Sequence, residues 1–469
     1  MATGLCIAEA GSLEKLNFQD LALLRMESAA RPFHIAGLLE FSPPAGAPRD
    51  YLRRLAVALG RTLPRFDAVF RRRLEGADSG SPYWVEAADY DPACHVLHYA
   101  LPQPGRLEDL LVLLSREHER LLERSRPLWE WHLVEGLPRG RFALYCKIHH
   151  ALIDGVGAMR LIDRMLSEDP RAGLGADDRA GAAEPGGHRP PRGRGWFDGV
   201  AEAAGVVRGQ MTAVPEVAAL LMRMGGDARN DAPPLPFTAP RAIMNGEIGP
   251  HRRLMVTGFP LATMRRIGES VDGTINDALL AVCGGALRDY LLEQRSLPQK
   301  TLLAGVPVSL RDGEGHDGNQ LGLMVSSLGT ATRDPLARLR HIARSTARAK
   351  QQLRQLSPAA RQDYMNMILL PAVALTVAGA STSVPPPFNV LVSNVPGPSR
   401  PLYMAGSRLE GIYPLSLVTD AMALNITAVS SATRLCLGIT ACPDNLPGIE
   451  RLAARLDAAV RELKAAALP

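Results

Sequence analysis

The sequence predicts a mixed α/β fold. In both halves of the 469-residue chain, stretches with the helical spacing of apolar residues alternate with short runs rich in β-branched residues. Hydrophobic residues make up 46% of the chain and charged residues 22%, which excludes a disordered or fibrous protein and leaves enough apolar material for a core. The length is typical of two or three domains, or of one unit built from two similar halves.

The expected elements follow from these patterns in chain order. Amphipathic helices are predicted over 51–63 and 106–122, an alternating strand over 142–148, and a helix over 156–166. In the second half, helices are predicted over 276–294 and 335–356, and strands over 301–308 and 388–393. The segment HHALIDG therefore lies where a strand turns into a helix, a position that commonly holds catalytic groups.

A break in composition predicts the domain boundaries. Residues 168–195 are rich in Gly, Pro, Ala and charge and nearly lack large apolar side chains, which is typical of a linker. We expect an N-terminal half over 1–167, a linker with connecting helices over 168–243, and a C-terminal half over 244–469. The connecting helices are expected within 196–224, with an interruption near Pro215.

The charge balance disfavours nucleic acid as a partner. Lys and Arg total 53 against 48 Asp and Glu, a net charge of +5 spread over a large surface. Nucleic-acid binders concentrate basic residues much more strongly on one face. An anionic small ligand or an anionic membrane surface fits the balance equally well.

The cysteines and the apolar segments indicate a reducing, intracellular setting. The six cysteines lack paired C-x-x-C spacing, so neither a zinc site nor a disulfide scaffold is predicted. The N-terminus has no signal-peptide pattern. The most apolar stretch, 367–380, is too short to span a membrane and contains Pro371 and Gly379; a buried segment or one that dips into a membrane surface fits it.

Residues 145–159, YCKIHHALIDGVGAM, carry the strongest chemical signal. Adjacent side chains on a strand point to opposite faces, so one ring of His149 and His150 can face a cleft while the other faces the protein. Histidine is the natural general base near neutral pH, because its unperturbed pKa is about 6.5. Asp154 is expected to fix the geometry of the turn, and Gly155 to permit a tight one.

Other chemistries fit the sequence less well. HExxH is absent and HHxxxD offers no third metal ligand nearby, so no metal site is predicted. A G-x-S-x-G elbow is also absent, which disfavours a covalent serine mechanism. A histidine acting as a general base remains, beside the plainer interpretation that each histidine is a structural residue.

Several ordered motifs together resemble one family. HHALIDG resembles the HHxxxDG signature of the bacterial wax ester synthase/acyl-CoA:diacylglycerol acyltransferases, within the superfamily of CoA-dependent acyltransferases that carry HxxxD. Further segments resemble motifs of the same family: LNFQDLALLRME at 16–27, RPLW at 126–129, TINDA at 274–278, VPVSLR at 306–311 and NVLVSNVPGP at 389–398.

The resemblance implies a fold and a reaction. The fold is a two-domain one like that of chloramphenicol acetyltransferase, with the active-site tunnel at the domain interface. The reaction is acyl transfer from a fatty acyl-CoA, the co-substrate, to diacylglycerol or a long-chain alcohol, without an acyl-enzyme and without a bound cofactor. By the same resemblance His150 is the general base, and His149 and Asp154 support it; the CoA-binding residues are not identified.

Two interpretations of Asn276 stay open. By its match to the family's ND motif, Asn276 is a candidate donor to the oxyanion. It is equally a candidate N-cap for a helix beginning at Asp277, because Asn is among the best N-cap residues. Asp277 itself is expected to be structural.

A basic helix bears on the location of the protein. Arg340, Arg344 and Arg348 recur at i, i+4 spacing, which predicts either a solvated face or a site for CoA phosphates or an anionic leaflet. We expect a cytoplasmic protein held peripherally at the inner face of the plasma membrane or at lipid droplets. The alternatives are an acyltransferase for a smaller alcohol or amine and a non-catalytic lipid-binding relative; the oligomeric state is not indicated.

Overall fold

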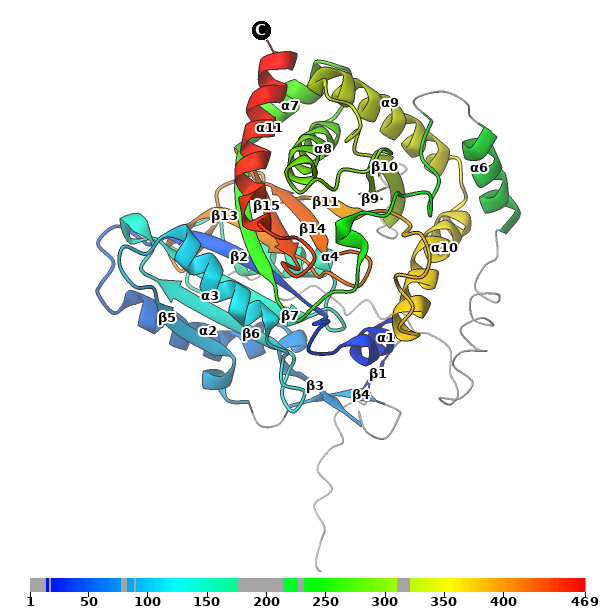
Figure 1. The fold of residues 1–469 in the computed structure, drawn as a ribbon. Coiled ribbons are helices and arrows are strands. Elements are labelled where there is room, and N and C mark those ends of the chain that lie inside the picture. The colour runs from blue at the N-terminus through cyan, green and yellow to red at the C-terminus, as the bar shows by residue number, and fades with distance from the viewer. Residues whose placement is uncertain are drawn as a thin grey trace, which may run out of the picture. The chain divides into compact units, whose positions relative to one another are not determined.

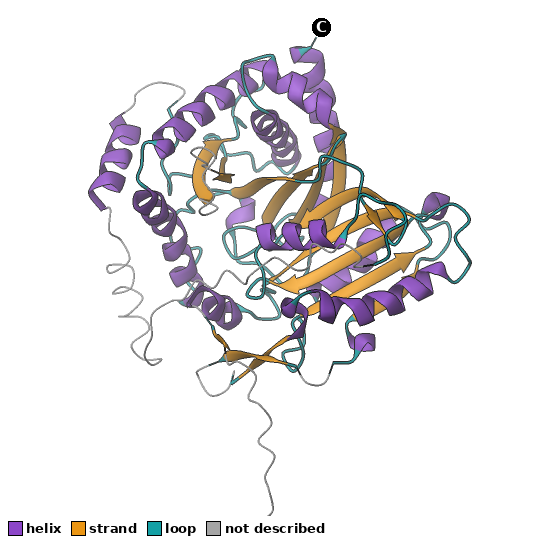
Figure 2. Cartoon of the chain, turned by 180° about the vertical axis from the view of Figure 1, so that it is seen from behind, coloured by secondary structure: helices purple, strands orange, loops and turns teal. Residues whose placement is uncertain are grey.

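Each half of the chain is built on a six-stranded sheet. The computed structural model describes residues 14–16, 18–76, 82–87, 90–174, 214–226, 232–309 and 321–468. Unit 1 comprises Met1–Trp196 and Arg400–Ile412, and unit 2 comprises Phe197–Ser399 and Tyr413–Pro469. The strands of both sheets and the helices that pack on them are seen in Figures 1 and 2. The predicted α/β class is confirmed.

The large sheet of unit 1 centres on β7, whose eight residues are all buried. The strand order is β12-β13-β2-β7-β6-β5, and β7 pairs antiparallel with both β2 and β6. A second, three-stranded sheet has the order β1-β4-β3. The strands of unit 1 are β1 (Glu14–Lys15), β2 (His34–Ser42), β3 (Arg72–Glu75), β4 (Tyr83–Glu86), β5 (Val96–Ala100), β6 (Trp129–Glu135), β7 (Phe142–His149), β12 (Tyr403–Met404) and β13 (Ser407–Leu415).

Helices cover both faces of this sheet. They are α2 (Tyr51–Phe66), α3 (Leu107–Glu119) and α4 (Gly155–Met165), and all three agree with the predicted ranges to within a few residues; unit 1 also contains α1 (Phe18–Met26). Helix α3 lies over the face that carries Tyr145 and Lys147, since its C-terminal residues bind both side chains. Helix α4 lies over the opposite face, where Ile162 comes close to Gly37.

Residues 400–412 return to unit 1 from far along the sequence. The hydroxyl of Tyr51 donates to the carbonyl of Ala405 at 2.8 Å and lies 2.6 Å from the hydroxyl of Ser407. Main-chain hydrogen bonds also join Ser167 and Tyr403 in both directions. Strands β12 and β13 thereby complete a sheet whose other strands all come from the first third of the chain.

The sheet of unit 2 has the order β10-β9-β11-β14-β15-β8. Strand β11 runs parallel to both of its neighbours, whereas the other pairings are antiparallel. The sheet is therefore mixed. Its strands are β8 (Arg253–Pro260), β9 (Leu303–Ser309), β10 (Leu321–Ser327), β11 (Val390–Pro396), β14 (Leu424–Ser430) and β15 (Arg434–Ala441).

Helix α8 forms the centre of the apolar core of unit 2. Residues 277–287 of this helix are buried without a break, as expected of a helix that is apolar on every side. It packs against α11 and α9, as Figure 1 shows. The helices of unit 2 are α6 (Val214–Gly226), α7 (Leu261–Glu269), α8 (Ile275–Glu293), α9 (Pro335–Arg354), α10 (Pro358–Val377) and α11 (Leu452–Ala467).

Several of the predicted segments lie partly outside the residues that the structure describes. Most of the predicted linker, 175–195, lies outside the described residues, as does 196–213 of the connecting helices; Pro215 is the second residue of α6. The apolar stretch 367–380 begins inside α10, where Leu369 is 39% exposed. Among the helices that the structure describes, none combines the length and the apolar character that a membrane span requires.

Two adjacent glycines of α8 provide a test of the packing. A Cβ on Gly284 would overlap the main-chain carbonyl oxygen of Leu328, whereas a Cβ on Gly285 would meet side chains alone, the end of Arg338 at 2.8 Å and Cβ of Ala459 at 3.4 Å. We expect Gly284→Ala to lower the free energy of unfolding by about 1–3 kcal/mol, as overpacking does in other cores. Gly285→Ala is the matched control and should cost less. Chemical unfolding followed by circular dichroism measures both; equal stability of the two variants would contradict the packing.

Candidate active site

The HHALIDG segment joins the central strand of unit 1 to a helix. Strand β7 ends at His149, and α4 begins at Gly155 after a short turn. Asp154 is the N-cap of α4: its Oδ1 accepts the N–H of Gly157 at 2.6 Å, which satisfies one of the free amides at the helix start. The strand-to-helix junction that the periodicity predicts is thus present.

The two histidines lie in different surroundings. The side chain of His149 is fully buried, whereas His150 is only partly buried. Both are held by their main chain: the N–H of His149 donates to the carbonyl of Leu128, and the N–H of His150 to the carbonyl of Phe33, each at 2.9 Å. Of the pair, His150 is thus the more accessible residue.

The ring of His149 is fixed from two sides. Its Nδ1 accepts the N–H of Ala151 at 3.0 Å. Its Nε2 lies 3.4 Å from Oε1 of Glu27, within ion-pair distance although not aligned for a hydrogen bond. The side chain of Glu27 is buried, and its other oxygen, Oε2, lies 3.2 Å from Nη2 of Arg124. The environment of His149 is therefore polar and closed.

The surroundings of His150 favour its neutral form. Burial is the largest effect and lowers the pKa of His150. A hydrogen bond to its own backbone and the negative charge of Asp154 raise the pKa, but burial dominates. At neutral pH the imidazole therefore holds a free lone pair, as a general base requires.

Asp154 has a clear structural role at the start of α4, whereas nothing in the structure requires a glycine at position 155. Asp154 is exposed and caps α4, in agreement with its expected role at the turn. The expectation that Gly155 supplies a tight turn is wrong, because its φ is not positive and a Cβ there would meet nothing within 4 Å. The crowded glycine is Gly157, where a Cβ would lie 2.8 Å from Cγ1 of Ile153.

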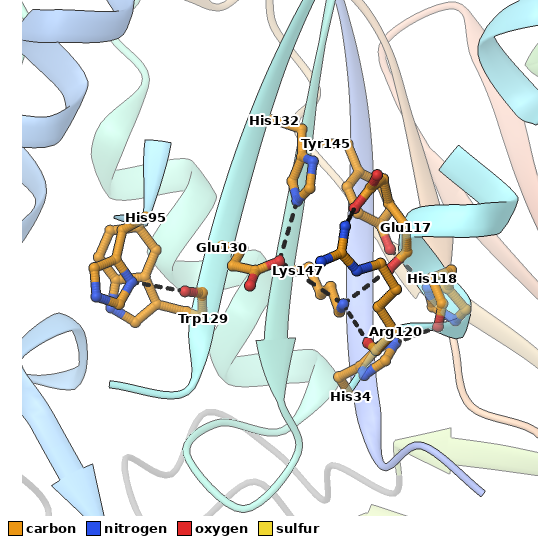
Figure 3. Close-up of polar contacts among 10 residues, drawn as sticks. All are labelled: His34, His95, Glu117, His118, Arg120, Trp129, Glu130, His132, Tyr145 and Lys147. Atoms are coloured by element: carbon orange, nitrogen blue, oxygen red, sulfur yellow. Dashed lines mark hydrogen bonds and ion pairs between the residues drawn. The ribbon is translucent and has the colours of Figure 1, made fainter. Parts of the chain in front are cut away.

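A layer of polar side chains lies beneath His149 on the same face of the sheet. Figure 3 shows Lys147 at its centre. The ammonium of Lys147 donates to the carbonyls of Glu117 and Arg120, at 2.8 and 2.5 Å, and lies 3.9 Å from a carboxylate oxygen of Glu130. Burial lowers the pKa of Lys147 to about 8, against the opposing charges of Glu130 and Glu117. The carbonyls at the end of α3 thus hold a buried cation.

Three further residues in this layer, His34, His118 and Tyr145, are linked by two hydrogen bonds. His34 lies opposite His149 in the register of β2 and β7, and its Nε2–H donates to the carbonyl of His118 at 2.8 Å. The Nδ1 of His118 lies 2.7 Å from the hydroxyl of Tyr145 (Figure 3). Burial and the charge of Lys147 hold the pKa of His34 well below its usual range. His34 is therefore neutral beside His149.

The PLW residues lie at the start of β6, the strand beside β7. Pro127, Leu128 and Trp129 are all buried. The indole N–H of Trp129 donates to the carbonyl of Phe70 at 3.0 Å. Because the carbonyl of Leu128 accepts the N–H of His149, this motif contacts the main chain of the candidate site directly.

Asn276 belongs to unit 2, at the start of α8. The N-cap of this helix is Thr274, so the interpretation of Asn276 as the N-cap is wrong. Thr274 and Asp277 form a capping box, and Asp277 also accepts the hydroxyl of Thr346 at 2.6 Å, in agreement with its expected structural role. Among the described residues, none is seen to hydrogen-bond the partly buried side-chain amide of Asn276.

Sequence reasoning missed the charged residues that surround His149. Glu27 and Arg124 lie about a hundred positions apart in the chain, so no local spacing connects them. Lys147 could have been found, because it stands two positions before His149 on a strand and therefore shares its face. Within the described residues, no cluster of three or more His, Cys, Asp or Glu side chains suits a metal ion.

A solved condensation domain has a fold similar to that of this chain. The structure is similar to the starter condensation domain of rhizomide synthetase, solved with a CoA derivative, with a TM-score of 0.57 over 97% of this chain and 94% of that one. The sequence identity is 14%, so this likeness concerns the fold alone. The predicted two-domain α/β fold is thus shared with this solved domain.

Closer matches define the family. The model of the wax ester synthase/diacylglycerol acyltransferase catalytic domain matches residues 16–279, and that of the WS/DGAT C-terminal domain matches residues 317–464. The chain is 39% identical over 459 residues to the probable diacylglycerol O-acyltransferase tgs2 of Mycobacterium tuberculosis, covering 95% of this chain and 98% of that protein. The wax ester synthase/diacylglycerol acyltransferase of Marinobacter aquaeolei VT8 matches with a TM-score of 0.77 and 36% identity, over 97% of this chain and 99% of that one.

This chain belongs to the wax ester synthase/diacylglycerol acyltransferase family. The resemblance drawn from HHALIDG and its companion motifs is thereby confirmed, as is an O-acyltransferase as the class of enzyme.

Proposed function

We propose that this protein transfers a long fatty acyl group from acyl-CoA to diacylglycerol, to a long-chain alcohol, or to both, with His150 as the general base. The observation that carries the proposal is the pairing of a partly exposed, neutral His150 with a fixed His149 at the end of β7. The families and relatives matched above support the two acceptors.

In the proposed reaction, the alcohol attacks the thioester directly. His150 removes the hydroxyl proton as the alcohol oxygen forms its bond to the acyl carbonyl carbon. The tetrahedral intermediate then expels CoA as its thiolate, and the imidazolium of His150 returns the proton to the sulfur. No acyl-enzyme forms, and acyl-CoA is a co-substrate rather than a resident cofactor.

Asn276 is the proposed donor to the oxyanion of the tetrahedral intermediate. Its amide lacks a hydrogen-bond partner among the described residues, whereas the neighbouring Asp277 is fully engaged in the cap of α8. Oxyanion donors of this kind contribute about 3 kcal/mol to the transition state.

The acceptors are insoluble in water, and we place the protein at a lipid surface in the cytoplasm, either the inner face of the membrane or a lipid droplet. Arg340 and Arg344 are exposed on α9 and provide positive charge for anionic headgroups. Arg348, expected on the same stripe, is partly buried and engaged by other residues. The proposed contact therefore involves two arginines rather than three.

The base can be tested by substitution. We expect His150→Ala to lower turnover of palmitoyl-CoA with hexadecanol or diacylglycerol by roughly 10²–10⁴-fold, the usual contribution of a positioned base. Release of CoA thiol measures the reaction. His251→Ala is the matched control, because His251 is an exposed histidine of unit 2. Near-normal turnover by His150→Ala contradicts the assignment, and reaction of short acyl chains alone contradicts the lipid substrates.

The pH dependence should report the lowered pKa of His150. The base acts when it is neutral, so kcat/KM should rise with pH through this pKa and reach its plateau at or below about pH 7. The apparent pKa should lie below 6.5, the ordinary value. Asp154→Asn keeps a good N-cap but removes the charge that raises the pKa of His150. Its profile should shift to lower pH; a shift to higher pH would contradict the assignment.

The lipid contact predicts a charge effect on binding. Arg340→Glu with Arg344→Glu should lower co-sedimentation with anionic liposomes, and the loss should be smaller at high salt because screening already weakens the contact. Arg461→Glu with Lys464→Glu makes the same change of charge on exposed positions of α11. Equal binding by all forms, or equal losses in both variants, would show that α9 is not the docking face.

A further inference from the structure

We propose that Glu27 is a positioning residue for the acyl transfer: it holds His149 in one tautomer and, through His149 and Phe33, holds the main chain that carries His150. The inference rests on the proposed function, because it concerns His150 as the base. All the residues involved belong to unit 1.

Glu27 is a buried carboxylate with three partners. Its side chain is 2% exposed and lies just after the end of α1. Oε1 accepts the N–H of Phe33 at 3.2 Å and faces Nε2 of His149 at 3.4 Å. Oε2 lies 3.2 Å from Nη2 of Arg124, which also donates to the carbonyl of Leu24. A buried carboxylate is costly unless it is paired, so each partner has a part in keeping it charged.

The contacts define the protonation of both groups. Nδ1 of His149 accepts the N–H of Ala151, so it carries no proton. The ring is therefore neutral, with its proton on Nε2, the atom that faces Glu27. Burial raises the pKa of Glu27, but His149, the N–H of Phe33 and Arg124 together outweigh this effect and lower the pKa overall. Glu27 thus remains a carboxylate that faces a proton donor.

Two routes lead from Glu27 to His150. In the first, Glu27 orients His149, whose Nδ1 holds the N–H of Ala151, the residue after His150. In the second, Glu27 accepts the N–H of Phe33, and the carbonyl of Phe33 accepts the N–H of His150. The peptide groups on both sides of the His150 ring are therefore tied to one carboxylate.

An amide cannot replace this carboxylate. Three donors, on Phe33, His149 and Arg124, point at Glu27, and two oxygens can accept from all of them. Glutamine has the same shape, but only its amide oxygen can accept hydrogen bonds. Because the guanidinium of Arg124 is charged, we expect the amide oxygen to turn to it, which leaves the NH₂ group facing Phe33 and His149. The conflict with His149 is relieved when its proton moves from Nε2 to Nδ1, and this breaks the bond from Ala151. Glu27→Gln therefore changes the tautomer and releases the turn at His150.

The experiment measures the tautomer and the turnover together. In Glu27→Gln, selective ¹⁵N-histidine NMR should show the His149 signals, identified by their loss in His149→Ala, moving from the Nε2–H to the Nδ1–H pattern. CoA release should fall roughly 100-fold in kcat, the scale expected for a base that is misplaced, with KM for palmitoyl-CoA little changed. Glu130→Gln is the matched control: this partly buried acid pairs with Lys147 and His132, so it should leave the His149 signals unchanged.

A double-mutant cycle tests whether Glu27 acts through its neighbours. One route passes through His149. The loss of activity in the double variant, expressed as a free energy, should therefore be smaller than the sum of the losses in Glu27→Gln and His149→Ala. Full additivity, an unchanged His149 tautomer or normal kcat in Glu27→Gln would overturn the inference. His150→Ala, assayed alongside, separates the two proposals: normal turnover there refutes the base itself, whereas its loss together with normal Glu27→Gln refutes only the role of Glu27.

Discussion

The alternation of side chains along β7 is the constraint on which the candidate site depends. Adjacent residues of a strand point to opposite faces, so the two histidines at its end cannot share one environment. Because β7 is buried along its whole length, His149 must be accommodated inside the protein. The strand ends at this residue, and His150, the first residue beyond it, is only partly buried. The difference between the two histidines thus follows from where the strand stops.

Burying His149 requires polar partners. The surrounding residues provide them, but several of these are charged groups that are themselves removed from water. Lys147 lies on the same face of the sheet as His149, and its ammonium group donates hydrogen bonds to carbonyls at the end of α3. The same charge, together with burial, keeps His34 neutral. Glu27, held by Arg124, supplies the negative charge nearest to His149. Charges of both signs are therefore buried near this strand, each with hydrogen-bond partners, as a low dielectric demands.

The sequence was sufficient for the local features and insufficient for the distant ones. Helix and strand ranges such as those of α8 and β7 follow from periodicity, and the strand-to-helix junction at Asp154 follows from them. The cap of α8 was readable as well, since Thr274 and Asp277 have the spacing of a capping box. No pattern joins Glu27 to His149 or returns residues 400–412 to unit 1, because these contacts depend on tertiary packing.

The lowered pKa of His150 has opposite effects on the two proton transfers of the proposed reaction. A weaker base removes the alcohol proton less readily, so this transfer must accompany the attack on the thioester rather than precede it. The imidazolium that results is correspondingly a stronger acid, and even a cysteine thiol has an unperturbed pKa of about 8.5. Return of the proton to the CoA thiolate is therefore favourable. A partly buried histidine with a lowered pKa therefore suits a reaction whose nucleophile is deprotonated only during attack and whose leaving group accepts the proton readily.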